Sequence, residues 1–361
     1  MISNCSSDDV HSALLFIDAS CDRDSWVRVG MSIKSEFGDE GFSIFDAWSS
    51  SGDNYSAADS ASTWRSIKGE GGTTIGSLFH DAKAKGWEPD KRELTDAERE
   101  SRALIAKQRK EKIEKEKKAE AENRDYWFRL YSQFVNDLVF VNDILRPAGK
   151  SAYLENKKVD ALGVLFVQRG LIILISLVDR KVEAITGKEN ISQFFRNEEY
   201  KNKERYSFLY LKPGTICIPM FDDESVIYSL QIIFESGKKR FLKESRKSGL
   251  SYWIGGTPAP SKWGAPVILI AEGFSTAASL HMATGLPVVV AFDAGNLPSV
   301  VEGVAKKFPA AMVVICCDDD SAKKDAGLKK GKQAAEETGS QFILPDFSSI
   351  SSDKKMSEVS R

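Results

Sequence analysis

The sequence has few of the features that mark a membrane or secreted protein. Its longest candidate for a membrane span, the largely apolar stretch Leu171 to Val178, has eight residues, far short of the roughly 20 that cross a bilayer. The start of the sequence has polar Ser3, Asn4 and Ser6 rather than a charged segment and an apolar stretch, so no secretory signal is expected. The five cysteines form no Cys-x-x-Cys pair. These absences predict a cytoplasmic protein in a reducing compartment, without a membrane partner.

An excess of charge of one sign is also missing. Fifty Lys and Arg residues oppose fifty-two Asp and Glu residues, which gives a formal net charge of −2. This balance excludes a uniformly basic nucleic-acid coat, although it does not exclude a local basic patch. The sequence contains no Gly-x-x-x-x-Gly-Lys-Ser/Thr loop, so we expect no helicase motor in this chain.

The length of 361 residues suits two or three domains. Residues 1–90 predict a small helical domain, because apolar residues recur there at helical spacing and Gly-rich breaks separate the segments. This part holds four of the seven tryptophans, which we expect to form its core: Trp26, Trp48, Trp64 and Trp87.

Residues 91–150 differ because charges of alternating sign dominate their first half. We expect a charged helical linker here, with a helix that starts at a capping box made by Thr95 and Glu98. Favourable i,i+4 pairs, such as Glu98 with Arg102, support a solvated helix. The alternation of sign favours a spacer over a nucleic-acid arm.

The rest of the chain predicts two parts that contain sheets and a tail. Residues 151–260 are rich in β-type runs and predict a basic α+β subdomain. In residues 261–347, apolar strands alternate with helical patterns, which is typical of a parallel, Rossmann-like sheet. The expected fold class is therefore multidomain α/β with a helical N-terminal domain. Residues 348–361 are polar, and we expect them to be disordered.

Three acidic residues follow two predicted strands of the parallel part. Glu272 ends the strand Val267–Ala271, and Asp318 and Asp320 follow the strand Met312–Cys317. Right-handed crossovers would make these strands neighbours and bring the carboxylates together. Three adjacent carboxylates need a cation, and oxygen ligands select Mg²⁺ or Mn²⁺. Acidic residues after a strand also act as turn formers or helix N-caps, and that alternative stays open.

A run of basic residues precedes the parallel part. It contains one acid, Glu244. A charge run is often only a solvated surface, but beside a carboxylate site it could hold the phosphates of a template or a nucleotide. Its basic residues are Lys238, Lys239, Arg240, Lys243, Arg246 and Lys247.

Several motifs resemble known primase families. Ile270–Gly273, Ala291–Asn296 and Cys317–Asp320 are similar to the three signature regions of a Toprim domain, most of all that of phage and plasmid primases of the TraC-like type. The preceding block resembles the basic subdomain of bacterial replicative primases in the segments Ile218–Asp222, Ser229–Gln231 and Lys238–Leu242. The N-terminal part resembles a PriCT-type helical domain in the segments Trp26–Met31, Phe45–Trp48, Trp64–Ile67 and Thr74–Phe79.

The resemblance implies a DNA primase of a mobile element. Such an enzyme is a nucleotidyltransferase that needs Mg²⁺ or Mn²⁺ and joins nucleoside triphosphates into short primers on single-stranded DNA. Carried over residue by residue, the catalytic and metal-binding roles fall to Glu272, Asp318 and Asp320. Asp293, after the second strand, either faces the same cleft or caps the turn before Asn296.

The sequence also departs from the family. It has no Cys-rich zinc ribbon, and the acidic ending of relatives is reduced to Asp346–Ser349. Template selection and unwinding are therefore expected from partners, including a replicative helicase in trans. Two alternatives remain: a Toprim-type DNA nuclease, and a non-catalytic replication accessory that binds DNA or a helicase.

Overall fold

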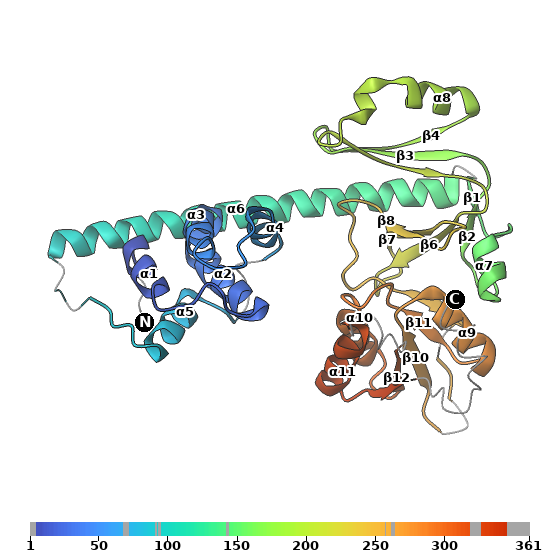
Figure 1. Ribbon diagram of the computed structural model, residues 1–361. Coiled ribbons are helices and arrows are strands. Elements are labelled where there is room, and N and C mark those ends of the chain that lie inside the picture. The colour runs from blue at the N-terminus through green and yellow to red at the C-terminus, as the bar shows by residue number, and fades with distance from the viewer. Residues whose placement is uncertain are drawn as a thin grey trace. The chain divides into compact units, whose positions relative to one another are not determined.

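The chain forms two compact units, Met1–Glu122 and Asn123–Arg361. Within the described ranges, no helix combines the length and the apolarity that a bilayer crossing requires. The computed structural model (Figure 1) describes residues 5–67, 72–90, 92, 95–141, 144–256, 258–260, 264–317 and 326–344.

The first unit is helical. Asp22 starts its second helix by accepting hydrogen bonds from the backbone N–H groups of Asp24 and Ser25. Gly38 ends the same helix with a φ of 60°, a left-handed conformation that glycine adopts without a steric penalty. The elements are α1 (Ser7–Leu14), α2 (Arg23–Phe37), the 3-10 turn η1 (Gly38–Gly41), α3 (Phe42–Ser49), α4 (Ala57–Ser66), α5 (Ile75–Ala84) and the start of α6 (Asp96–Asn136).

The core of the first unit is aromatic. Trp48, Trp64 and Trp87 are buried, and Trp26 is half-buried against them. Phe45 is fully buried, with its ring centroid 4.8 Å from that of Trp26 and 5.4 Å from that of Trp64. The prediction of a tryptophan core is therefore confirmed.

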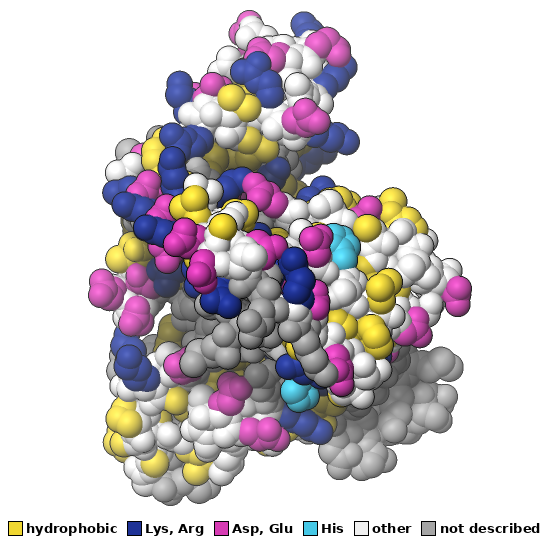
Figure 2. Space-filling model, turned by 90° about the vertical axis from the view of Figure 1, so that its left-hand side faces the viewer, with side chains coloured by type: hydrophobic (Ala, Val, Ile, Leu, Met, Phe, Trp, Pro, Cys, Tyr) yellow, Lys and Arg dark blue, Asp and Glu magenta, His cyan; other side chains and the backbone are white. Residues whose placement is uncertain are grey.

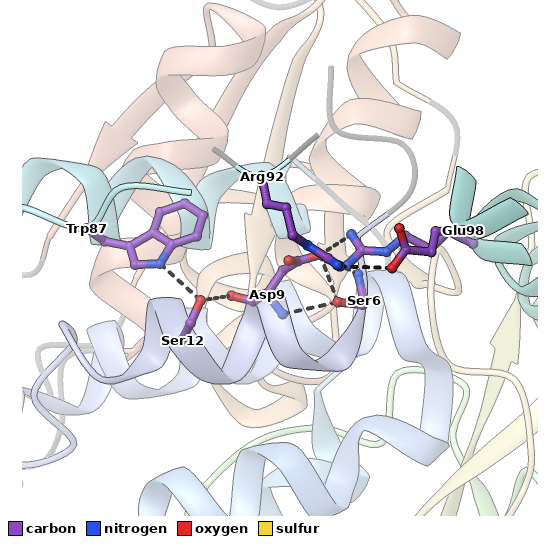
Figure 3. A network of polar contacts seen from close by, with 7 residues as sticks. Ser6, Asp9, Ser12, Trp87, Arg92 and Glu98 are labelled. Carbon is purple, nitrogen blue, oxygen red and sulfur yellow. Dashed lines mark hydrogen bonds and ion pairs between the residues drawn. The ribbon is translucent and has the colours of Figure 1, made fainter. Parts of the chain in front are cut away.

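Helix α6 begins at the predicted capping box. The backbone N–H of Thr95 donates to Glu98 Oε2 at 2.8 Å, and that of Glu98 donates to Thr95 Oγ1 at 3.2 Å. Arg102, expected to pair with Glu98, instead contacts Asp9 of α1 at 3.0 Å. Figure 3 shows the polar network around Asp9, in which the indole N–H of Trp87 also donates to Ser12. The start of α6 is thus fastened to the helical unit rather than only solvated.

A second contact of α6 is half-buried. Arg109 pairs with Glu36 at 3.3 Å and lies over the ring of Phe37, 4.1 Å from its centroid. Burial raises the pKa of Glu36 above its ordinary value, and the charge and hydrogen bond of Arg109 oppose that rise. The ion pair therefore compensates for a carboxylate that the fold partly removes from water.

The described residues of the second unit form three sheets, of which the first is antiparallel. Residues of α6 from Asn123 onward belong to this unit, and Trp127 and Tyr131 pack in a core shared with the first two sheets. The first sheet has the order β1-β2-β6-β7-β8. Its strands are β1 (Leu145–Arg146), β2 (Leu165–Val167), β6 (Ile216–Phe221), β7 (Ile227–Ile233) and β8 (Lys239–Phe241).

The second sheet lies between β2 and β6 in the sequence. Both faces of its central strand are buried: one packs toward the first sheet and the other packs under α8. Its order is β4-β3-β5. The elements here are β3 (Leu171–Ser176), β4 (Lys181–Thr186), α8 (Lys188–Arg196), the 3-10 turn η3 (Glu198–Lys201) and β5 (Tyr206–Leu211). The π-helical turn η2 (Asp137–Val141) and α7 (Ala152–Lys157) complete this part.

The third sheet is the parallel one, with the order β13-β12-β10-β11-β9. Alternate residues of β10 face two cores, one shared with α9 and the first sheet and the other with α10 and α11. Of the strands described in this sheet, β9 alone runs antiparallel to its neighbour. The elements are β9 (Tyr252–Ile254), β10 (Val267–Ala271), α9 (Phe274–Thr284), β11 (Val288–Val290), α10 (Leu297–Lys307), β12 (Met312–Cys316), α11 (Ala326–Thr338) and β13 (Gln341–Ile343).

The parallel sheet confirms the predicted alternation of strands and helices. β10 has the predicted bounds, Val267–Ala271, and β12 ends at Cys316, one residue before the predicted end. The antiparallel edge strand β9 and the elements β4, α8 and β5 were not predicted. The tail, residues 348–361, lies outside the described residues.

Substitution of Phe45 tests the aromatic core. Phe45→Ala removes a fully buried ring, so we expect it to lower the free energy of unfolding of the first unit by about 3–5 kcal/mol. Phe16→Ala is the matched control, because Phe16 is 43% exposed, and its effect should stay within about 0.5 kcal/mol. Native-state hydrogen exchange of the α3 amides measures both, and equal effects would contradict the assignment of the core.

The Arg109–Glu36 pair gives a pH-dependent prediction. Because the pKa of Glu36 is raised on folding, the folded unit binds that proton more tightly than the unfolded chain. The free energy of unfolding therefore falls as the pH rises through the raised pKa. Arg109→Met removes the opposing cation, so the pKa of Glu36 should rise further and the fall in stability should move to higher pH. NMR titration of the Glu36 carboxyl tests this, with the exposed Arg99→Met as control; a lowered pKa would contradict it.

Candidate active site

The carboxyl end of β10 positions Glu272 at the edge of the parallel sheet. β10 is fully buried and pairs with β11 on one side and with β12 on the other. Glu272 is the first residue after the strand and is half-buried. Gly273 follows it as the N-cap of α9. The carboxyl edge of a parallel sheet is where such folds bind ligands, so Glu272 lies in a position suited to chemistry.

The other two predicted ligands follow the neighbouring strand. Cys316 lies directly opposite Ala271 in the ladder between β12 and β10, as the crossover argument requires. Asp318 and Asp320 themselves lie outside the described residues. Among the residues that the structure describes, no three His, Cys, Asp or Glu side chains come close enough together to hold a metal ion.

A lysine of the basic run reaches the turn at Glu272 and Gly273. Lys239 lies on β8, and its Nζ is 3.3 Å from the position that a Cβ on Gly273 would occupy. A side chain at residue 273 would therefore crowd the ammonium group. The absence of a side chain at Gly273 therefore allows Lys239 to approach this turn closely. As a result, the Lys239 ammonium group lies beside the end of β10, where Glu272 is located.

The basic segment, defined here as Lys238–Lys247, does not form one continuous surface. In the ladder between β7 and β8, Lys239 lies opposite Ile233 and Arg240 lies opposite Ile232. Since side chains alternate along a strand, Lys239 shares the face of Ile233, which packs toward the parallel sheet. Arg240 shares the face of Ile232, which belongs to the core with the three-stranded sheet. The structure therefore separates two adjacent cations onto opposite faces.

The other cations of the basic segment divide into exposed and engaged ones. Lys238 and Lys243 are exposed. Arg246 lies over the ring of Tyr228, 4.8 Å from its centroid, and 3.9 Å from a carboxylate oxygen of Asp222. Lys247 pairs with Asp293. The exposed cations have their charge available to a ligand, whereas Arg246 and Lys247 already have protein partners.

A hydrogen bond from α6 fixes the backbone of the basic segment. The buried hydroxyl of Tyr131 donates a hydrogen bond to the carbonyl oxygen of Lys243. Burial, and secondarily the charge of Glu244, raise the pKa of Tyr131. The phenol therefore stays protonated and remains a donor throughout the ordinary pH range.

The turn after β11 explains Asp293. Its Oδ1 accepts a hydrogen bond from the backbone N–H of Asn296 at 2.9 Å, which is the capping role left open by the sequence. Its Oδ2 binds the ammonium group of Lys247 at the same time. Asp293 thus joins the turn after β11 to the end of the basic segment.

Two buried polar residues lie beside this turn, and the sequence placed both in family-like segments without indicating a role for either. Asn296 is 2% exposed, and the Gln231 side chain is fully buried and donates to the carbonyl oxygen of Phe292 at 3.4 Å. A glutamine within the mostly apolar strand β7 was a usable signal, since a buried amide needs partners. Asn296 gave a weaker signal, because asparagine is common in turns.

Charges of both signs are interspersed on one face of the molecule. On the face drawn in Figure 2, dark-blue Lys and Arg side chains alternate with magenta Asp and Glu side chains. This agrees with the net charge of −2. An anionic ligand would therefore respond to local cations rather than to a broad positive field.

Known families match two regions of the chain. Residues 10–82 match the family described as primase C terminal 2 (PriCT-2), and residues 267–350 match a Toprim domain. Two curated relatives are DNA primases TraC from Escherichia coli. One is 40% identical over 135 residues, which are 36% of this chain and 12% of the relative. The other is 39% identical over 135 residues, 36% of this chain and 9% of the relative. The chain thus matches a small fraction of the length of these relatives.

Two solved structures show a distant likeness. The DnaG primase catalytic domain bound to single-stranded DNA is 14% identical with a TM-score of 0.36, over 62% of this chain and 71% of that chain. A second structure, the DnaG catalytic core, is 15% identical with a TM-score of 0.33, over 65% and 74%. The family matches confirm both domain resemblances noted in the sequence: the chain carries a PriCT-2 domain and, around Glu272, a Toprim domain.

Proposed function

We propose that the chain is a divalent-metal-dependent DNA primase of a mobile element, which makes short primers on single-stranded DNA from nucleoside triphosphates. The observation that carries the proposal is the approach of Lys239 to the turn at Glu272 and Gly273. This approach places Lys239, a cation suited to binding phosphate, beside Glu272 at the carboxyl edge of the Toprim sheet. The relatives named DNA primase TraC support the same reaction class.

The donor set at this edge fits a hard cation. Glu272 offers carboxylate oxygens, and Asp318 and Asp320, which follow β12 in the sequence, are donors of the same kind. Mg²⁺ and Mn²⁺ prefer such oxygen ligands. When bound, the ion would stabilise the charge that develops during phosphoryl transfer. All three side chains are proposed as its ligands.

The chain's own groups orient the reactants. Lys239 would bind a phosphate oxygen of the incoming nucleotide, next to Glu272. The 3′-hydroxyl of the growing primer attacks the α-phosphate, the bond to the β-phosphate breaks, and pyrophosphate leaves. Lys238, Arg240 and Lys243 would contact backbone phosphates of the template, which set its position without reading its sequence.

The domain division extends this proposal. We assign template or helicase contact to residues 1–90, a spacer role to residues 91–150 and phosphate binding to residues 151–260. Residues 261–347 would carry the chemistry. Template choice and duplex unwinding would then come from a replicative helicase in trans.

Glu272→Gln tests the reaction. The substitution keeps the shape of the side chain but removes its charge, so we expect primer synthesis to fall by about three orders of magnitude. Glu302→Gln on α10 is the matched control, because Glu302 is exposed on the same domain, and it should retain activity. Labelled nucleotides on a single-stranded template with Mg²⁺ or Mn²⁺ give the readout. Template cleavage without synthesis would indicate a nuclease, and activity unaffected by Glu272→Gln would overturn the site.

The opposite faces of Lys239 and Arg240 give a second prediction. Lys239→Ala should lower kcat/KM for nucleotide incorporation by about 10- to 100-fold, since a hydrogen bond to a charged group contributes roughly 1.5–3 kcal/mol. Arg240→Ala should affect template affinity instead and reduce its logarithmic salt slope by about 0.7. Lys306→Ala, an exposed lysine of α10, is the control. Equal effects of Lys239→Ala and Arg240→Ala on both readouts would contradict the assignment.

A further inference from the structure

The turn after β11 has a backbone conformation that needs support. Phe292 has a φ of 73°, in the left-handed region that bulky residues rarely adopt. Such conformations persist where surrounding contacts fix them. Gln231 of β7 supplies one of these contacts by donating to the carbonyl oxygen of Phe292.

Asn296 supplies further contacts. Its Nδ2 donates to the carbonyl oxygens of Leu250 and Ala291, each at 2.8 Å. Its Oδ1 accepts a hydrogen bond from the backbone N–H of Gly249 at 2.8 Å. Both amide protons and the carbonyl oxygen of this buried side chain are therefore used. Asn296 ties the chain that follows the basic segment to the turn at the edge of the parallel sheet.

An ion pair completes the connection. Asp293 accepts from Lys247, and the ammonium group of Lys247 lies 5.4 Å from the centroid of the Phe241 ring. Phe241 is the last residue of β8, two positions from Lys239, and it lies opposite Gln231 in the ladder between β7 and β8. The turn after β11 therefore contacts β8 in two ways. One route runs through Gln231 of the neighbouring strand β7, and the other runs through Lys247 to Phe241, the last residue of β8.

We propose that Asn296 and Asp293 are positioning residues that hold Lys239 at the turn of Glu272 and Gly273. Together with Lys247 they form what we name the Asn296 clasp. In this arrangement Lys247 belongs to the clasp and is not a phosphate ligand. The inference deepens the proposed primase function, on which it rests for the role of Lys239.

A double-mutant cycle tests whether Asn296 acts through Lys239. Asn296→Ala alone should lower kcat/KM for nucleotide incorporation by about tenfold. This is within the range expected for loss of the charge-assisted hydrogen bond between Lys239 and a nucleotide phosphate. In the Lys239→Ala background the same substitution should cause almost no further loss, because the group that it positions is already gone. Additive losses would show a general structural effect and would overturn the proposal.

Asp293→Asn gives a second test, in which the direction of the change in ligand affinity is predicted. Asp293 is partly exposed, so the test does not require a substitution in the core. If the clasp exists, this variant should bind a labelled single-stranded oligothymidylate and ATP more weakly, although it removes a negative charge. If Lys247 is instead a phosphate ligand restrained by Asp293, the variant should bind more tightly, which would overturn the proposal. Lys247→Met keeps an apolar stem over Phe241 and should leave the salt slope unchanged; a slope reduced by about 0.7 would identify a phosphate contact.

Failure of the clasp is distinguishable from failure of the primase function. Absence of primer synthesis by the wild-type chain would count against the primase function alone. The clasp then has its own readout in hydrogen exchange of the Gly249 amide, which donates to Asn296. Asp293→Asn should accelerate that exchange by at least about tenfold while leaving the α10 amides protected. Unchanged exchange at Gly249 would overturn the clasp regardless of activity.

Discussion

The candidate site depends on the apolar contact between the antiparallel sheet and the parallel sheet. Ile216, Ile218 and Ile233 of the first sheet share one buried core with Leu269 and Ala271 of β10. This contact sets how closely β8 approaches the end of β10. The cation of Lys239 and the strand end that carries Glu272 are thus brought together by hydrophobic burial, which is large but has no directional preference. Direction must come from polar contacts, and the turn after β11 supplies them.

The contacts of Asn296 are stable because all of its polar atoms have partners in a place that water reaches poorly, whereas Gln231 Oε1 has no hydrogen-bond partner among the described residues. A buried amide without partners would destabilise the fold, whereas Asn296 has a partner for each of its polar atoms. The ion pair of Lys247 and Asp293 is only partly buried, with side-chain exposures of 42% and 29%. A pair of this kind contributes modestly to stability, so its main effect is on geometry. The same logic applies at Glu36, where burial raises the pKa and Arg109 limits the rise.

Much of the parallel sheet could be predicted because buried parallel strands are continuous apolar runs with clear stops. Val267–Ala271 is such a run. The start of α10 is marked by Pro298, which lies in the first turn of that helix. β4 could not be predicted, because it is a partly exposed edge strand with charged residues, Lys181 and Glu183. For the candidate site, local sequence indicated Glu272 and the basic run. It could not indicate that Lys239 and Arg240 face opposite ways, since that depends on the register of β8 with β7, nor that Lys247 pairs with Asp293, 46 residues away.

The charge balance of the chain limits how it could hold a nucleic acid. A net charge of −2 with both signs interspersed gives little long-range steering, so attraction must come from a few cations at short range. In the basic segment, Arg246 and Lys247 already have acidic partners, and Arg240 faces away from the parallel sheet. Lys239 is therefore the cation of this segment that combines exposure with a position beside Glu272. Under the proposed function, this cation would hold one phosphate of the reacting nucleotide. The template would then be held by Lys238, Arg240 and Lys243, away from this position, together with other surfaces or partners.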